Sequence, residues 1–236
     1  MKIGLVSFQC RNGDPAFNMS QVERALKESQ GRIDLLCFGE AFLQGFDSLT
    51  WDYETDKETA LSQDSGPIAR LKDWSVQYST ALLTGYIEKS DDRLFSSCIV
   101  IAEGQILYNY RRISKGWKEY SKTDEHYCEG NAVEGFRFHG KDFMLGLCGD
   151  LWDHPEKFRT ESPLIWPIYV NYSLEDWEQE ILADYASHAS KIARDVFMVD
   201  PLDADPVNHG GAFHFRNGQI VDRLPFDREG ILIVEI

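Results

Sequence analysis

Three kinds of side chain in this sequence could together break a bond to a carbonyl carbon: a thiol, a carboxylate and a cation. The thiol is that of Cys148, which ends an apolar run that begins at Phe143 and turns polar at Gly149. Such a run predicts a short buried strand, and α/β proteins place their chemistry at the carboxyl ends of strands. Cys148 is therefore a candidate nucleophile. The alternative is a small apolar side chain in the core, the commoner role of a free cysteine.

Glu40 is the candidate carboxylate. It follows the nearly continuous apolar run 33–38, which predicts a strand that is covered on both faces of its sheet. Glu40 would then lie at the same kind of strand end as Cys148, where a carboxylate could take the proton of the thiol. The competing interpretation is a solvated loop charge, which is the usual fate of a glutamate.

Cations gather in segment 110–130 of an otherwise acidic chain. A thiolate that attacks a carbonyl or nitrile carbon creates negative charge, and a neighbouring cation or hydrogen-bond donor must stabilise it. A lysine within 112–118 is the candidate, so that Glu40, this lysine and Cys148 would form a triad. The alternative for this segment is a solvated basic loop.

The composition limits the partners of the protein. The chain has 236 residues, of which 43% are hydrophobic, and it shows no repeat, linker or internal boundary, so we expect one domain over 1–236. Its 24 basic and 39 acidic residues give a net charge of −15, which opposes binding to nucleic acids and anionic membranes. We therefore expect a small-molecule or protein partner.

Neither a leader nor a bound metal is expected. The first residues, 1–8, lack the features of a secretory signal, and no run approaches the roughly 20 apolar residues of a membrane span, so we expect a cytoplasmic protein. The five cysteines form no CxxC pair and the six histidines show no HExxH spacing. These patterns argue against a disulfide framework or a zinc site, and we expect no metal and no cofactor.

Strand-like and helix-like patterns alternate along the chain, which predicts a mixed α/β sheet. Strands are expected at 3–9, 33–38, 81–86, 98–102, 105–114, 143–148, 163–171, 196–199, 212–215, 219–221 and 231–236. Helices are expected after a capping box at Ser20 and Glu23, after Ser65, and from Ser173 to Ile192. Segments 47–64 and 200–211 are expected to be irregular, and Asn217-Gly218 predicts a hairpin turn.

Several separated motifs occur in the order of a known family. They are Gln9, Asn18, 33–46, 85–88, 110–112, 148–152, 155–156 and 210–213. With these motifs, which span nearly the whole chain, the sequence resembles the nitrilase superfamily of carbon-nitrogen hydrolases. The resemblance implies a four-layer αββα sandwich that pairs as a homodimer. It also implies a Glu-Lys-Cys triad that forms a thioester with the acyl part of an amide-like substrate and then hydrolyses it.

The resemblance implies that Glu40 is the base and Cys148 the nucleophile. It further suggests Glu125 as an assisting acid, with Glu119 as its rival, and either can instead be a surface charge. The backbone amide of Gly149 is a candidate oxyanion donor. Two tryptophans, Trp152 and Trp166, are candidates for the wall of the pocket, with core packing as the alternative.

The cation of the triad is open at this stage. The family usually reads Tyr-Arg-Lys at the end of the strand after Gly104, and this chain has Arg112 in the place of that lysine. An arginine can stabilise an oxyanion but cannot share protons as a lysine can. Lys115 and Lys118 follow shortly. Lys118 is the favoured candidate, because Gly116-Trp117 would fix the backbone before it, whereas Lys115 would lie in a turn.

The sequence thus favours an amidase-like hydrolase that cleaves a non-peptide carbon-nitrogen bond in a small amide or N-carbamoyl compound, with a nitrile less favoured. The alternative is a catalytically silent nitrilase-like binding or scaffold protein, which the displaced lysine supports. A third possibility is a glutaminase-like module that supplies ammonia to a partner. The loops that would line the pocket carry no readable code for the substrate.

Overall fold

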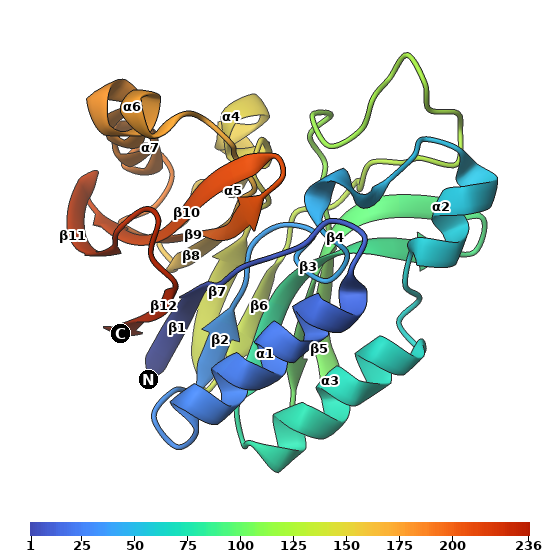
Figure 1. Ribbon diagram of the computed structural model, residues 1–236. Coiled ribbons are helices and arrows are strands. Elements are labelled where there is room, and N and C mark those ends of the chain that lie inside the picture. Colours follow the sequence, from blue (N-terminus) through green and yellow to red (C-terminus); the bar gives the residue numbers. More distant parts are fainter.

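The strands form two six-stranded sheets that pack face to face between outer layers of helices (Figure 1). The computed structural model describes residues 1–236. The first sheet has the order β12 (Gly230–Glu235), β1 (Lys2–Ser7), β2 (Leu35–Cys37), β3 (Ala81–Ser90), β4 (Arg93–Ala102) and β5 (Gln105–Arg111). The second has the order β11 (Gln219–Leu224), β10 (Val207–Arg216), β9 (Asp195–Ala204), β8 (Leu164–Pro167), β7 (Lys141–Leu145) and β6 (Gly135–Phe138). The αββα prediction is confirmed.

The helices lie on the two outer faces of the sandwich. Figure 1 shows α1 (Pro15–Ser29) and α3 (Gly66–Gln77) along one side of the molecule, opposite α6 (Leu174–Asp176) and α7 (Leu182–Ala189). The remaining helical segments are η1 (Phe46–Ser48), α2 (Tyr53–Thr59), α4 (Asp150–Asp153), α5 (Pro155–Phe158) and the π turn η2 (Trp177–Ile181). None of the helices is long and apolar enough to cross a membrane.

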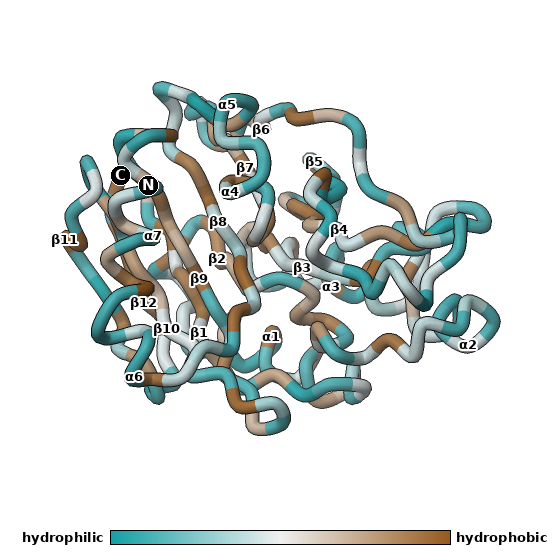
Figure 2. The backbone as a smooth tube through the Cα atoms, turned by 90° about the horizontal axis from the view of Figure 1, so that it is seen from above, coloured by the Kyte–Doolittle hydropathy of each residue, from teal (hydrophilic) through white to brown (hydrophobic).

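The main core lies between the two sheets. The cluster of 37 buried residues includes Leu5 and Cys37 from the first sheet and Leu145 and Phe197 from the second, and it continues beneath α7, for example at Tyr185. A second cluster of 20 buried residues packs α1 and α3 against the outer face of the first sheet. Figure 2 shows the apolar residues concentrated along strands such as β8 and β9, with hydrophilic residues along the outer loops. Burial of this apolar surface is the main force that holds the layers together.

The direction of the strands brings the candidate residues to the same end of the sandwich. In the first sheet β2 is parallel to β1 and β3, and in the second β8 is parallel to β7 and β9. Two successive antiparallel pairings make β5 run in the direction of β3, so it ends at the same edge as β2. Glu40 follows β2, Arg112 follows β5 and Cys148 follows β7. Side chains that follow parallel strands gather at such an edge.

Two predictions about helix boundaries were wrong. The capping box at Ser20 does not form, because α1 already begins at Pro15 and the Asp14 carboxylate accepts from the Phe17 amide at 2.9 Å. An aspartate followed by proline is a stronger start than a serine inside the helix. The helix predicted to end at Ile192 ends at Ala189 and includes a π turn, although its cap at Ser173 is confirmed.

The two segments expected to be irregular contain regular structure. Within 47–64, α2 forms behind an Asp52 cap that accepts from the Glu54 amide. Segment 200–211 belongs to a long hairpin of β9 and β10 whose turn contains Asp205-Pro206. Polar residues on these strands bond to one another, so the hairpin lacks the apolar period that marks a strand. The hairpin at Asn217-Gly218 is confirmed, with both residues at positive φ.

Candidate active site

Cys148 lies on a tight turn rather than inside a strand. The strand β7 ends at Leu145, and Cys148 adopts a φ of 41°, in the left-handed region that is unfavourable for residues other than glycine. Two hydrogen bonds hold it there: its amide donates to the Pro167 carbonyl at 2.9 Å, and its carbonyl accepts from Trp166 Nε1 at 2.9 Å. The strained turn presents the thiol, half-buried, with Sγ 3.8 Å from the Tyr169 carbonyl oxygen.

Asp150 fixes this turn to the end of β5. Its Oδ2 accepts from the Leu147 amide at 2.9 Å and from the Tyr110 hydroxyl at 2.6 Å. Its Oδ1 accepts from the amides of Ile113 and Ser114 at 3.0 and 2.7 Å. One buried carboxyl group therefore connects the chain around Cys148 with the chain that follows Arg112. In the sequence, Asp150 is only a polar residue that follows an expected strand. Most of its hydrogen-bond donors lie more than 35 residues away, so this role could not be recognised from the sequence.

Glu40 and Arg112 form a buried ion pair. Arg112 Nη1 lies 2.9 Å from Glu40 Oε1 and 3.1 Å from Oε2, and the two side chains are 3% and 0% exposed. The Ser96 hydroxyl donates to Glu40 Oε1 at 2.7 Å, and Arg112 Nε donates to Ser114 Oγ at 2.7 Å. These contacts satisfy both charges where water does not reach them, as a buried pair requires. The two serines carry no signal in the sequence that would have marked them.

The charges of this pair act on the thiol. Burial raises the pKa of Cys148 to about 12, the negative charge of Glu40 adds to the rise, and the positive charge of Arg112 opposes it. Burial alone would lower the pKa of Arg112, but the charges of Glu40, Cys148 and Asp150 raise it above its ordinary value. At neutral pH the site therefore holds a permanent cation and a protonated thiol, which needs a base before it can attack.

Two hydrogen-bond donors beside Cys148 have no partner within the protein. They are Nη2 of Arg112 and the backbone amide of Gly149. A Cβ atom on Gly149 would lie 2.6 Å from Nη2, and one on Gly116 would lie 3.0 Å from it. The two glycines thus make room for a guanidinium group. Free donors next to a nucleophile can stabilise an oxyanion.

The two lysines lie elsewhere. Lys118 Nζ contacts the Tyr127 carbonyl oxygen and lies 3.1 Å from Glu129 Oε1. It lines a surface pocket of about 560 Å³ that does not include Glu40 or Cys148. Lys115 Nζ lies 5.6 Å from the centre of the Tyr120 ring. Of the three candidate cations, Arg112 is the one that contacts Glu40.

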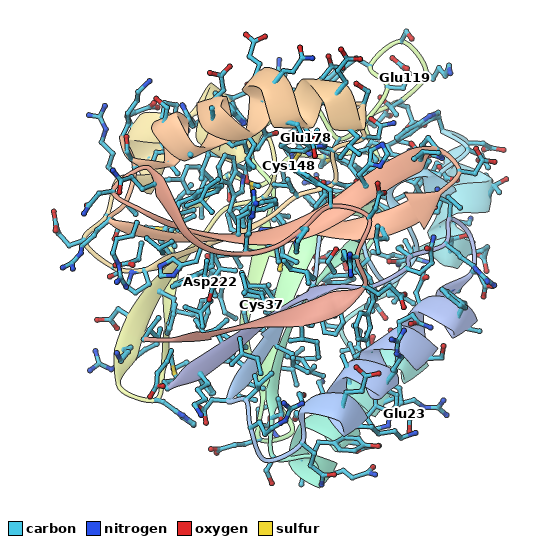
Figure 3. The ribbon with its side chains drawn as sticks, turned by 60° about the vertical axis from the view of Figure 1, so that its left-hand side comes forward. Glu23, Cys37, Glu119, Cys148, Glu178 and Asp222 are labelled. Carbon is cyan, nitrogen blue, oxygen red and sulfur yellow. The ribbon has the colours of Figure 1, made fainter.

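Of the tryptophans and assisting glutamates suggested by the sequence, Trp166 contacts the chain around Cys148 and the others lie away from it. Trp166 is fully buried and contacts the Cys148 backbone, whereas Trp152 is 39% exposed and stacks on the His188 ring at 3.9 Å. Glu125 lines the pocket of Lys118, and Figure 3 shows Glu119 on a peripheral loop, away from Cys148. No group of three or more His, Cys, Asp or Glu side chains is arranged to hold a metal ion.

The sequence model of the carbon-nitrogen hydrolase family matches residues 2–236 of this chain. The chain belongs to this family. An (R)-stereoselective amidase from Pseudomonas sp. is 29% identical over 169 residues, which are 70% of this chain and 57% of that protein. The match thus spans a little over half of the length of this relative. The predicted resemblance to the nitrilase superfamily is confirmed.

Solved structures share the fold of this carbon-nitrogen hydrolase. A CN-hydrolase superfamily protein from Xanthomonas campestris, with an arsenic adduct in its active site, has a TM-score of 0.80 at 17% identity over 99% of this chain and 89% of its own. An amidase from Nesterenkonia sp. has a TM-score of 0.78 at 17% identity over 100% and 90%. A glutamine-dependent NAD+ synthetase from Acinetobacter baumannii has a TM-score of 0.75 at 16% identity over 98% and 44%.

Proposed function

We propose that the protein is an amidase-like hydrolase that cleaves a small amide or N-carbamoyl compound through a thioester on Cys148. In this proposal Glu40 is the base, and Arg112 takes the place of the expected lysine. The observation that carries it is the buried Glu40–Arg112 pair, whose charges act on the Cys148 thiol. The amidase names of the sequence relative and of one structural neighbour support an amide substrate over a nitrile.

The first half of the reaction forms the thioester. Glu40 takes the proton of the thiol, and the thiolate attacks the carbonyl carbon of the amide. Negative charge develops on the carbonyl oxygen, where Arg112 Nη2 and the Gly149 amide are the available donors. When the intermediate collapses, the carbon-nitrogen bond breaks and the leaving amine takes the proton held by Glu40. Ammonia or an amine departs, and the acyl group stays on Cys148.

The second half of the reaction releases the acid. Glu40, ionised again, takes a proton from a water molecule, and the oxygen of that water attacks the thioester carbon. The same two donors stabilise the second oxyanion. Its collapse breaks the carbon-sulfur bond, and the thiolate recovers its proton from Glu40. The carboxylic acid leaves, and the enzyme returns to its starting state.

An arginine in this position changes which residue transfers protons and which supplies positive charge. Its guanidinium remains charged and planar, and contacts with Glu40 and Ser114 fix its orientation. It therefore supplies charge and a directed donor but exchanges no protons. Every proton transfer of the cycle then falls to Glu40.

Ammonia release from a panel of amides, N-carbamoyl compounds and nitriles tests the proposal, with Cys148→Ala as the control. We expect release from at least one amide or N-carbamoyl compound and none after the substitution. Iodoacetamide labelling distinguishes the alternative of a silent scaffold protein. A working site should make Cys148 more reactive than Cys10, Cys37 and Cys98, which are fully buried. Ammonia release that persists in Cys148→Ala would contradict the mechanism.

A homodimeric state and a cytoplasmic location belong to the same proposal. The resemblance implies the dimer, and the acidic charge of the chain supports a small-molecule substrate rather than a nucleic acid. Analytical ultracentrifugation of the purified chain tests the first, and cell fractionation tests the second. A monomer at micromolar concentration would contradict the dimer without affecting the proposed chemistry.

A further inference from the structure

Asp200 lies at the same edge of the second sheet as Cys148. The preceding residue, Val199, pairs with Pro167 of β8, and its carbonyl accepts from the Ile168 amide at 2.9 Å. The carbonyl of Pro167 in turn accepts from the Cys148 amide at 2.9 Å. Asp200 lies within β9, one residue beyond its pairing with β8, and Cys148 follows β7. The two residues therefore lie on either side of the carboxyl end of β8.

The position of Asp200 is fixed by its neighbours. Its Oδ1 accepts from Asn208 Nδ2 at 2.8 Å, and Asn208 Oδ1 accepts from the Gly210 amide at 3.0 Å. Its backbone carbonyl accepts from the Ser7 hydroxyl at 2.8 Å, and the same hydroxyl oxygen accepts from the Gly211 amide at 2.8 Å. Every one of these partners is buried or backbone. The carboxyl group is thus held in place before any ligand arrives.

The second carboxyl oxygen, Oδ2, is buried and has no hydrogen-bond partner, and the residue as a whole is 1% exposed. Buried polar atoms in proteins are nearly always paired, and an unpaired one destabilises the fold unless something else completes it. The proposed mechanism gives Oδ2 no role. Its partner must therefore come from outside the protein, either as a water molecule or as a group of a ligand.

The charged and titratable groups that face Asp200 show what that partner should be. They are Glu40 from the end of β2, the Cys148 thiol and the Tyr185 hydroxyl from α7. The cation of the site, Arg112, is already paired with Glu40. Burial raises the pKa of Asp200 well above its usual range, and the charge of Glu40 adds to the rise. The hydrogen bond from Asn208 to Oδ1 and the dipole of the nearby Val170 amide, which makes no hydrogen bond of normal geometry to Oδ2, oppose it. Without a ligand the carboxyl group therefore holds its proton more strongly than an ordinary aspartate does.

A second acidic pair lies on the other side of Tyr169. The Tyr169 hydroxyl donates to Asp203 Oδ2 at 3.0 Å, and its ring stacks on Phe46 at 4.9 Å, next to Asp47. Burial raises the pKa of Asp47, and the negative charge of Asp203 adds to the rise. The Tyr169 carbonyl oxygen lies 3.8 Å from Cys148 Sγ, so Tyr169 connects these acids to the site. Where these acids are ionised, their charge attracts cations and repels anions.

We propose that Asp200 selects the substrate by binding an ammonium group on an amide that also carries an amine. The inference rests on the proposed function, because it places the ligand at the Cys148 site. When the ligand binds, Asp200 gives its proton to the solvent, and its Oδ2 accepts a charge-assisted hydrogen bond from the ammonium N–H. A neutral amide offers no charge that would drive this ionisation, and a carboxylate in the same place is repelled.

Binding to the Cys148→Ala protein tests the proposal without catalysis. The probes are 5-aminopentanamide, its uncharged isostere hexanamide and the anionic adipamate, together with amines one carbon shorter and longer. Calorimetry in two buffers of different ionisation enthalpy gives both the affinity and the number of protons released. We expect the best amine to bind about tenfold or more tightly than its isostere. We also expect proton release with the amines alone.

Two matched variants identify the carboxyl group. In Asp200→Asn the preference for the amine should fall to about onefold and proton release should disappear. Asp222→Asn removes the same charge from an exposed position on β11, and both the preference and proton release should persist. Thermal unfolding and far-UV circular dichroism establish that each variant is folded. If Asp200→Asn does not fold, proton release in the Asp200 protein decides alone.

Several outcomes overturn the inference: equal binding of amines and isosteres, no binding of any amine, absence of proton release, or a preference that survives Asp200→Asn. Equal, weak binding would mean that a water molecule completes Oδ2. These results are independent of the proposed function, which fails instead if Cys148→Ala still releases ammonia. The affinities are measured in a protein that lacks the thiol, so a failure of the chemistry and a failure of the selectivity are distinguishable.

Discussion

Two arginine–glutamate pairs lie side by side at the end of β5, and they differ in how completely the carboxylate is bound. Arg111 holds Glu88 through Nε and Nη2, both at 2.9 Å, and Ser97 and Asn109 donate to the same carboxylate. Arg112 holds Glu40 through Nη1 alone. Consecutive residues of a strand point to opposite faces, which sends the two guanidinium groups in different directions.

The difference separates a structural pair from a chemical one. Burial alone would raise the pKa of Glu88, but its hydrogen bonds with Arg111, Ser97 and Asn109 lower it below the ordinary value. A carboxylate held in this way is a poor base, because protonation would cost it these bonds. Glu40 accepts from only two side chains, Ser96 and Arg112, and Arg112 keeps a free donor beside Cys148. The carboxylate with fewer hydrogen bonds, Glu40, is therefore the one that can exchange protons.

Replacing Glu40 and Glu88 separately by glutamine should give the largest difference in activity between the two pairs. We expect Glu40→Gln to lower kcat/KM by about 10² to 10⁴, since a positioned general base contributes that much. Glu88→Gln should leave kcat/KM within a few-fold and instead reduce the free energy of unfolding by about 1 to 3 kcal/mol, because it disrupts the hydrogen bonds of a buried carboxylate whose arginine partner is partly exposed. Ammonia-release kinetics and urea unfolding measure the two effects. Equal losses of activity would remove the distinction between the pairs.

Replacing the arginines should give a smaller contrast in the same direction. Arg112→Gln removes the cation and a donor, for which we expect a loss in kcat of about 10². Arg111→Gln should leave kcat unchanged within a few-fold, and Arg112→Lys should restore part of the loss by returning the charge. Single-turnover acyl-enzyme formation is the measurement. If Arg112→Gln remained fully active, the cation would have to come from elsewhere in the chain.

Alkylation of Cys148 should respond to Glu40 in the opposite sense to catalysis. The pKa of the thiol is raised to about 12, so its alkylation by iodoacetamide should increase about tenfold per pH unit from about pH 7 to about pH 11. Glu40→Gln removes a negative charge that raises this pKa, so alkylation at a given pH should become faster while hydrolysis becomes slower. Glu88→Gln serves as the control and should change neither. Alkylation that slows in Glu40→Gln would argue against this electrostatic account.

Lys118→Ala should have the smallest effect. Its contact with Glu129 is partly open to solvent, and pairs of this kind stabilise a fold by about 1 kcal/mol or less. We expect kcat/KM within twofold of the parent protein and a small change in the midpoint of urea unfolding. A large loss of acylation here, with Arg112→Gln still active, would restore the lysine predicted from the sequence.

Apolar runs and strand ends are local patterns, so they predict a mixed α/β sheet and the strand-end positions of Glu40 and Cys148, whereas the αββα sandwich is predicted by the resemblance to a known family. The sequence does not predict which cation meets Glu40. Lys118 follows Arg112 by six residues, and only the turn after Ile113, held by Asp150, decides which side chain points inward. Ser96 and Asp200 are also invisible to a local pattern, since their partners, Glu40 and Asn208, belong to other segments of the fold. Long-range hydrogen bonds have no period in the sequence.

The loop 115–129 leaves the site and returns to it at neighbouring points. The Ser114 amide is held by Asp150, and the Gly130 amide donates to the Arg112 carbonyl at 2.8 Å. Both anchors use main-chain amides, one bonded to the Asp150 carboxylate and the other to the Arg112 carbonyl, and neither acceptor lies within the loop. The anchors therefore fix where the loop leaves and rejoins the site, whereas Gly116 beside the guanidinium and the buried Trp117 and Tyr127 limit which of its residues can be exchanged.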